Sequence, residues 1–194
     1  MNKFRYTTIG QMLQILKTYS INAILFAIVW VMLANLWSTG VGRYIYVVIS
    51  LVTMFFTLYG CGEQIAKDDK KPYANRGICI KRSLYMPCLV MAAQILFILM
   101  FKLTWMLGSD GDNIQEVWAV ATNLMSYAWF APFGTIAGMN KGSFSVLGYV
   151  LMFLIPEGGY VLGYFAGAKG YDISEKLFGF MYEKKKEKKS GVKK

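Results

Sequence analysis

The chain has 194 residues, of which 56% are apolar, 16% aromatic and 16% charged, and it carries a formal net charge of +10. Soluble domains contain about 25% charged residues, whereas the apolar residues here form long blocks almost without charge, as in membrane proteins. The sequence has no histidine, and its three cysteines form no CxxC pair, which argues against metal-dependent and thiol redox enzymes. We therefore expect no metal and no cofactor.

The first 18 residues combine basic side chains with an amphipathic pattern. Thr8 and Gln11 have the spacing of a capping box. The apolar residues of one helical face are Ile9, Met12, Leu13 and Leu16. The pattern predicts either a short interfacial helix on the cytoplasmic leaflet or a helical extension of the first membrane span.

Four apolar blocks are each long enough to cross a bilayer, which takes about 20 residues. They cover residues 19–37, 41–62, 83–107 and 144–168. The turn between the first two blocks is so short that we expect them to form an antiparallel hairpin. Residues 63–82 are predicted to be a polar loop, and their six basic and three acidic residues indicate cytoplasmic anchoring rather than a nucleic-acid site.

A fifth apolar block, residues 117–139, is interrupted by Ala131-Pro132-Phe133-Gly134. If this block crosses the membrane, the C-terminal tail with its nine lysines lies outside the cell. If it is re-entrant or interfacial, both chain ends and 18 of the 21 basic residues are cytoplasmic, as the positive-inside rule favours. We therefore predict an all-α integral protein of the cell membrane with four transmembrane helices. Five transmembrane helices are the alternative.

The last span contains the sequence Pro156-Glu157-Gly158-Gly159, which predicts a helix break that carries a carboxyl group. A rise of about 1.5 Å per residue places this carboxyl near the middle of a hydrocarbon core about 30 Å thick. An ionised carboxyl at that depth costs a few kcal/mol. We therefore expect it to be neutral, hydrogen-bonded or facing water.

Three further polar residues fall at a similar depth, and with Glu157 they predict one buried polar layer: Gln94, Ser50 and Thr53. A broken helix with a carboxyl at the midplane is typical of transporter binding sites. The alternative is a capped helix kink, in which Glu157 bonds to Gln94 or to a backbone amide.

Glycines recur at every fourth residue in two places. Gly159, Gly163 and Gly167 form two overlapping GxxxG motifs, and Gly134 with Gly138 forms another. Such spacing allows helix backbones to approach closely. The sequence leaves open whether this packing occurs within the chain or between copies.

The tail from residue 169 to residue 194 ends in KKKEKKSGVKK. Basic clusters beside a membrane favour anionic lipids, and the residues predicted to contact them are Lys184, Lys185, Lys186, Lys188 and Lys189. Another membrane protein, or a second copy of the chain, is a further expected partner. Nucleic acid is the less favoured one.

Two short stretches, KPYANRG from Lys71 to Gly77 and GYFAGAKG from Gly163 to Gly170, resemble sequences in a group of small, uncharacterised multi-pass membrane proteins of Gram-positive bacteria. The resemblance implies a multi-pass topology and no particular activity.

No GxSxG, HExxH or Walker motif indicates an enzyme. We expect a non-enzymatic accessory or scaffold subunit of a membrane complex. The alternative is a small transporter or channel component built around Glu157.

Overall fold

The computed structural model describes residues 7–32, 40–71, 79–107, 113–133 and 144–171, and all regular structure in these ranges is helical. The helices, in chain order, are α1 (Thr8–Met32), α2 (Gly40–Asp69), α3 (Ile80–Tyr85), α4 (Cys88–Leu107), α5 (Asn113–Phe130) and α6 (Val146–Lys169). Four of the described helices are long and apolar enough to cross a membrane: α1, α2, α4 and α6. The prediction of an all-α multi-pass membrane protein with four spans is therefore confirmed.

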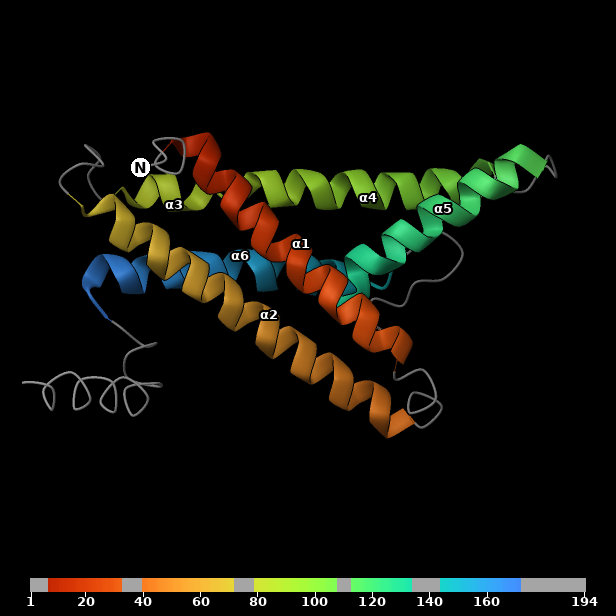
Figure 1. The fold of residues 1–194 in the computed structure, drawn as a ribbon, viewed down its shortest axis with the longest axis horizontal. Coiled ribbons are helices and arrows are strands. Elements are labelled where there is room, and N and C mark those ends of the chain that lie inside the picture. Colours follow the sequence, from red (N-terminus) through yellow and green to blue (C-terminus); the bar gives the residue numbers. More distant parts are fainter. Residues whose placement is uncertain (1–6, 33–39, 72–78, 108–112, 134–143, 172–194) are drawn as a thin grey trace, which may run out of the picture.

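The four long helices run along the molecule, and we name its two ends by the helices that meet there (Figure 1). At the near end α1 begins, α2 and α6 end, and α3 leads into α4. The far end is the opposite one, where α5 begins. Helix α5 runs back from the far end and stops in the middle of the bundle.

Helix α1 is continuous from Thr8 to Met32, so the extension of the first span is the correct alternative and a separate interfacial helix is wrong. Its N-cap is Thr7, whose hydroxyl accepts a hydrogen bond from the backbone N–H of Gly10 at 3.0 Å. Gln11, the second residue of the predicted capping box, uses its side-chain Nε2 to bond Asp69.

Helix α2 continues to Asp69, seven residues beyond the predicted end of the second span. The predicted loop therefore begins as helix, because Ile65 and Ala66 are buried in the core. Helix α2 contacts α1, but its most extensive packing is against α6; α2 and α6 both end at the near end and cross at an angle (Figure 1). The expected α1–α2 hairpin is thus a minor part of the packing.

Helix α6 is unbroken from Val146 to Lys169, with Pro156 inside it, so the predicted helix break at residues 156–159 is wrong. The helix ends at Gly170, whose φ of 79° lies in the left-handed region that glycine adopts without strain.

The core lies where α1, α2, α4, α5 and α6 meet, and its bulkiest side chains are aromatic. Its largest fully buried side chains include those of Tyr19, Phe101, Phe130, Phe133 and Tyr160. The described part of the predicted re-entrant segment begins within α5 and ends in a short 3₁₀ turn at residues 131–133, which is buried. Residues 134–139 of that segment lie outside the described residues, as do residues 33–37 of the first predicted span.

Candidate functional site

Gln94 is fully buried and holds α4 against α6. Its Nε2 donates a hydrogen bond to the carbonyl oxygen of Met152 at 2.9 Å. Met152 precedes Pro156 by four residues, and proline has no N–H to bond that carbonyl. Gln94 therefore supplies the donor that Pro156 lacks, which explains why α6 continues through the proline.

Ser50 and Tyr46, on α2, bind the inner end of α5. The Ser50 hydroxyl is within hydrogen-bond distance of the Pro132 carbonyl and also lies 2.9 Å from the Val47 carbonyl. The Tyr46 hydroxyl lies 3.0 Å from the Ala131 carbonyl and 2.9 Å from the Phe26 carbonyl. Each hydroxyl has a single proton, which it can donate to either of its two carbonyls. The last carbonyls of a helix have no partner within it, so these hydroxyls cap the helix where water cannot. Thr53, one turn further along α2, takes no part in these bonds.

The predicted polar layer is therefore not a single network. Gln94 and Ser50 each bond to a backbone carbonyl, on different helices, and neither bonds to Glu157. One carboxyl oxygen of Glu157, Oε1, is buried and has no hydrogen-bond partner among the described residues. The alternative in which Glu157 caps a kink through Gln94 is thus wrong.

Glu157 lies on the side of α6 that turns away from α2. Leu154, which precedes Glu157 by three residues and lies on a neighbouring part of the helix surface, is 62% exposed. A Cβ added at Gly158 would meet nothing within 4 Å, so the surface beside the carboxyl is open. Glu157 itself is only partly buried.

The glycine motif of α6 is used within the chain, where α6 packs against α2. A Cβ added at Gly159, Gly163 or Gly167 would lie 2.8, 2.0 or 2.7 Å from a backbone carbonyl oxygen of α2. These oxygens belong to Phe55, Tyr59 and Glu63 respectively. Gly134 and Gly138 lie outside the described residues.

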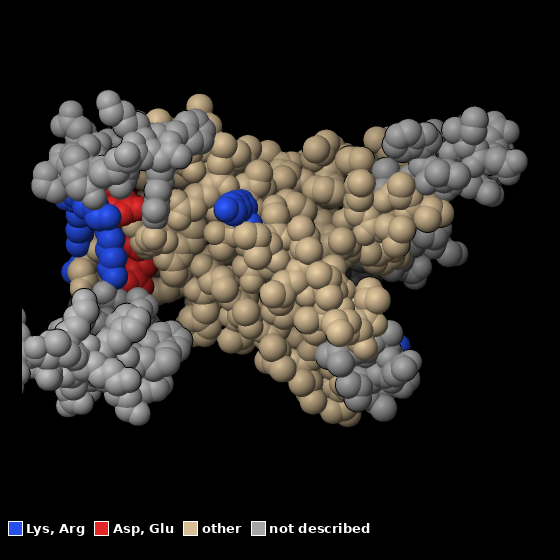
Figure 2. Space-filling model, viewed as in Figure 1, with Lys and Arg blue, Asp and Glu red and all other residues tan. Residues whose placement is uncertain are grey.

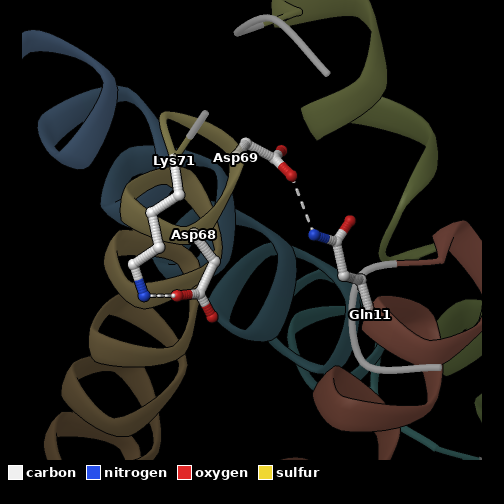
Figure 3. Close-up of polar contacts among 4 residues, drawn as sticks. All are labelled: Gln11, Asp68, Asp69 and Lys71. Atoms are coloured by element: carbon white, nitrogen blue, oxygen red, sulfur yellow. Dashed lines mark hydrogen bonds and ion pairs between the residues drawn. The ribbon is translucent and has the colours of Figure 1, made fainter. Parts of the chain in front are cut away.

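The near end holds buried acidic residues that the sequence analysis treated only as part of a loop. Asp69 is 2% exposed. Its Oδ1 accepts a hydrogen bond from Gln11 Nε2 at 2.9 Å, and its Oδ2 accepts one from the Tyr164 hydroxyl at 3.0 Å. Figure 3 shows the first of these contacts. A single carboxylate thus joins α1, α2 and α6.

Two ion pairs flank this contact on α2. Lys67 Nζ lies 2.7 Å from Glu63 Oε1, and Lys71 pairs with Asp68 (Figure 3). The spacings of four and three residues are those of helical ion pairs. They are the sequence signal that could have predicted that the second span continues as helix beyond residue 62. Figure 2 shows acidic and basic side chains gathered at this end of the molecule.

The structure gives no geometry for the predicted lipid-binding lysines of the tail. The lysines from Lys184 to Lys189 lie outside the described residues. Within the described ranges, no group of three or more His, Cys, Asp or Glu side chains is placed to hold a metal ion. No protein-family model, curated protein or solved structure matches the chain.

Proposed function

We propose that this multi-pass membrane protein is a non-enzymatic accessory or scaffold subunit of a membrane complex, and that α6 contacts the partner. The observation that carries the proposal is Glu157, an acidic side chain that is only partly buried on α6, a helix long and apolar enough to cross a membrane. An unpaired or charged polar group in hydrocarbon costs several kcal/mol. A basic or hydrogen-bonding side chain on a partner helix would remove that cost.

The surface beside Glu157 suits a second helix. Gly158 has open space where a side chain would stand, and small residues let helix backbones approach closely in membranes. The exposed side chains of Leu154 and Leu162 provide apolar contact on either side. A partner helix that packs along Leu154, Gly158 and Leu162 would have Glu157 at the edge of its contact, since neighbouring helical residues point about 100° apart.

We further propose that the protein lies in the cell membrane with both chain ends in the cytoplasm. The support is the distribution of charge, because four described lysines belong to helix ends that meet at the near end: Lys67, Lys70, Lys71 and Lys169. Lysine and arginine bias in short segments sets orientation. With the tail lysines, these side chains would bind anionic lipid, at about 1 kcal/mol for each basic residue.

Purification of the tagged full chain from its native membrane, with mass spectrometry of bound proteins, tests the accessory-subunit proposal. Gly158→Leu fills the open surface and should reduce recovery of a fixed partner at least about tenfold, which corresponds to about 1.4 kcal/mol. Gly60→Leu is the matched control, because Gly60 of α2 also has nothing within 4 Å of an added Cβ. Equal recovery with both variants, or no fixed partner with the wild type, would refute the proposal.

A second candidate function is a small transporter or channel component. It is favoured by α5, which stops in the middle of the bundle with its last carbonyls bound by α2. Non-helical backbone at membrane depth occurs only where it is buried in protein or lines a water-filled cavity. Proton-gradient-dependent flux in reconstituted vesicles that is lost in Glu157→Gln would support this function, and flux no greater than in empty vesicles would reject it.

A further inference from the structure

The inner half of α5 meets α1 and α4 through aromatic rings. The Trp129 ring stacks on Phe97 at a centroid distance of 4.5 Å and lies 4.8 Å from the Tyr19 ring. Phe97 follows Gln94 by three residues on α4, so both side chains lie on one face of that helix. The Tyr19 hydroxyl donates to the Trp129 carbonyl at 3.4 Å and also interacts with the Gln94 side chain. Gln94, Tyr19 and Trp129 therefore surround one point in the bundle.

Three buried polar atoms in this region have no hydrogen-bond partner among the described residues. They are Oε1 of Gln94, Nε1 of Trp129 and Oγ of Ser126. Gln94 and Ser126 are fully buried, and each residue is 0% exposed. Ser126 precedes Trp129 by three residues on α5, so the two share a helical face.

The orientation of the Gln94 amide is fixed by chemistry. Its nitrogen must face the Met152 carbonyl, because only the nitrogen can donate. Its oxygen is then an acceptor directed elsewhere in the core. An unsatisfied buried polar group costs about 1–3 kcal/mol, and such groups in folded proteins are usually satisfied by ordered water.

The three atoms define the kind of molecule that would satisfy them. Gln94 Oε1 only accepts, the Trp129 indole N–H only donates, and the Ser126 hydroxyl does either. A cation would meet the indole donor, and an anion would meet the amide acceptor, so neither ion is satisfied by both. A neutral molecule with a donor and an acceptor fits, and water is the smallest one.

We propose that the junction of α1, α4 and α5 is an internal water-binding site. The bound water donates a hydrogen bond to Gln94 Oε1 and accepts one from the Trp129 indole N–H, and Ser126 lies one turn before Trp129 on α5. The water thereby fastens the inner end of α5 to α4. The site is separate from Glu157, and its test is independent of the proposed function.

Nuclear magnetic resonance of the full chain in lipid nanodiscs, with ¹⁵N-labelled tryptophan, provides the test. The five tryptophans give five indole signals, and the signal that is lost in Trp129→Phe is that of Trp129. We expect a cross-peak between this indole proton and water, with the sign of a water bound for longer than nanoseconds. A cross-peak to another neutral solute in its place, or no cross-peak, overturns the proposal.

Variants show whether Gln94 is the second ligand. Gln94→Met removes the acceptor but also the donor to Met152, so it is combined with Pro156→Ala, which restores an N–H for that carbonyl. In this double variant the water cross-peak should fall at least about fivefold relative to Pro156→Ala alone. An unchanged cross-peak overturns the bridging water.

Hydroxyl protons that exchange with water could relay a signal to the indole. Tyr19→Phe combined with Ser126→Ala removes both neighbouring hydroxyls. Persistence of the cross-peak in this variant supports a bound water, and its loss overturns the assignment.

Discussion

Replacement of Gly163 by alanine should separate α2 from α6. The added Cβ would lie 2.0 Å from the Tyr59 carbonyl oxygen and 2.8 Å from its Cα. Ordinary contact begins near 3.4 Å, so the two backbones must part by roughly 1 Å in a close-packed interface. The obstructing atoms belong to the backbone, so no side-chain rotation can relieve the clash.

The size of the effect follows from two opposing terms. Overpacking costs about 1–3 kcal/mol, occasionally more, and a rigid backbone contact belongs at the upper end of that range. Alanine in place of glycine inside a helix returns about 0.5–1 kcal/mol. We therefore expect Gly163→Ala to lower the free energy of unfolding by about 2 kcal/mol.

Gly158→Ala is the matched control on the same helix. Nothing lies within 4 Å of its added Cβ, so only the helix-propensity gain remains, and stability should rise by about 0.5–1 kcal/mol. The two variants should thus differ by about 3 kcal/mol in unfolding followed by circular dichroism in mixed micelles of increasing denaturing-detergent content. Equal stabilities would show that α2 and α6 do not pack through Gly163.

Gln94→Leu should lower the free energy of unfolding of the wild-type protein by about 1–3 kcal/mol. In a Pro156→Ala background the loss should be smaller, because alanine provides the N–H that the Met152 carbonyl lacks. Equal losses in the two backgrounds, measured in the same unfolding assay, would contradict the role of Gln94 as the donor to Met152. Tyr164→Phe should cost about 1.5–3 kcal/mol, because a buried carboxylate of Asp69 loses a charge-assisted bond, whereas Tyr44→Phe, at an exposed position, should be close to neutral. A loss no larger than that of the Tyr44 variant would show that the Asp69 contact is not formed in the protein.

The four spans could be predicted from sequence because each apolar block carries its own signal, independent of its neighbours. The glycine stripe likewise marked one close-packing face on α6. Its partner surface on α2 includes backbone atoms of Phe55, Tyr59 and Glu63, which are large residues without a distinguishing motif. It also includes Gly62, where an added Cβ would clash with the Tyr160 backbone, and Ala66, which lies against Gly167. The spacing of Gly62 and Ala66 is that of a small-residue motif, and it is the sequence signal that could have identified α2 as the partner.

The errors came from local rules that distant residues override. Pro156 predicts a break when read alone, but Gln94, which lies 58 positions away in the chain, bonds the carbonyl that the proline leaves unpaired. The charged run after residue 62 likewise predicts a loop. It continues as helix because Asp69 bonds to Gln11, also 58 positions away, and to Tyr164.

Several polar side chains in the apolar part of the bundle are there because they bond to backbone carbonyls. In hydrocarbon, a carbonyl without a helical partner cannot turn to water, and the donors Gln94, Ser50 and Tyr46 each bond to such a carbonyl or to a helix end. Glu157 differs from these donors, because its buried Oε1 bonds to no group among the described residues. The need to satisfy backbone carbonyls therefore explains the positions of Gln94, Ser50 and Tyr46 but not that of Glu157.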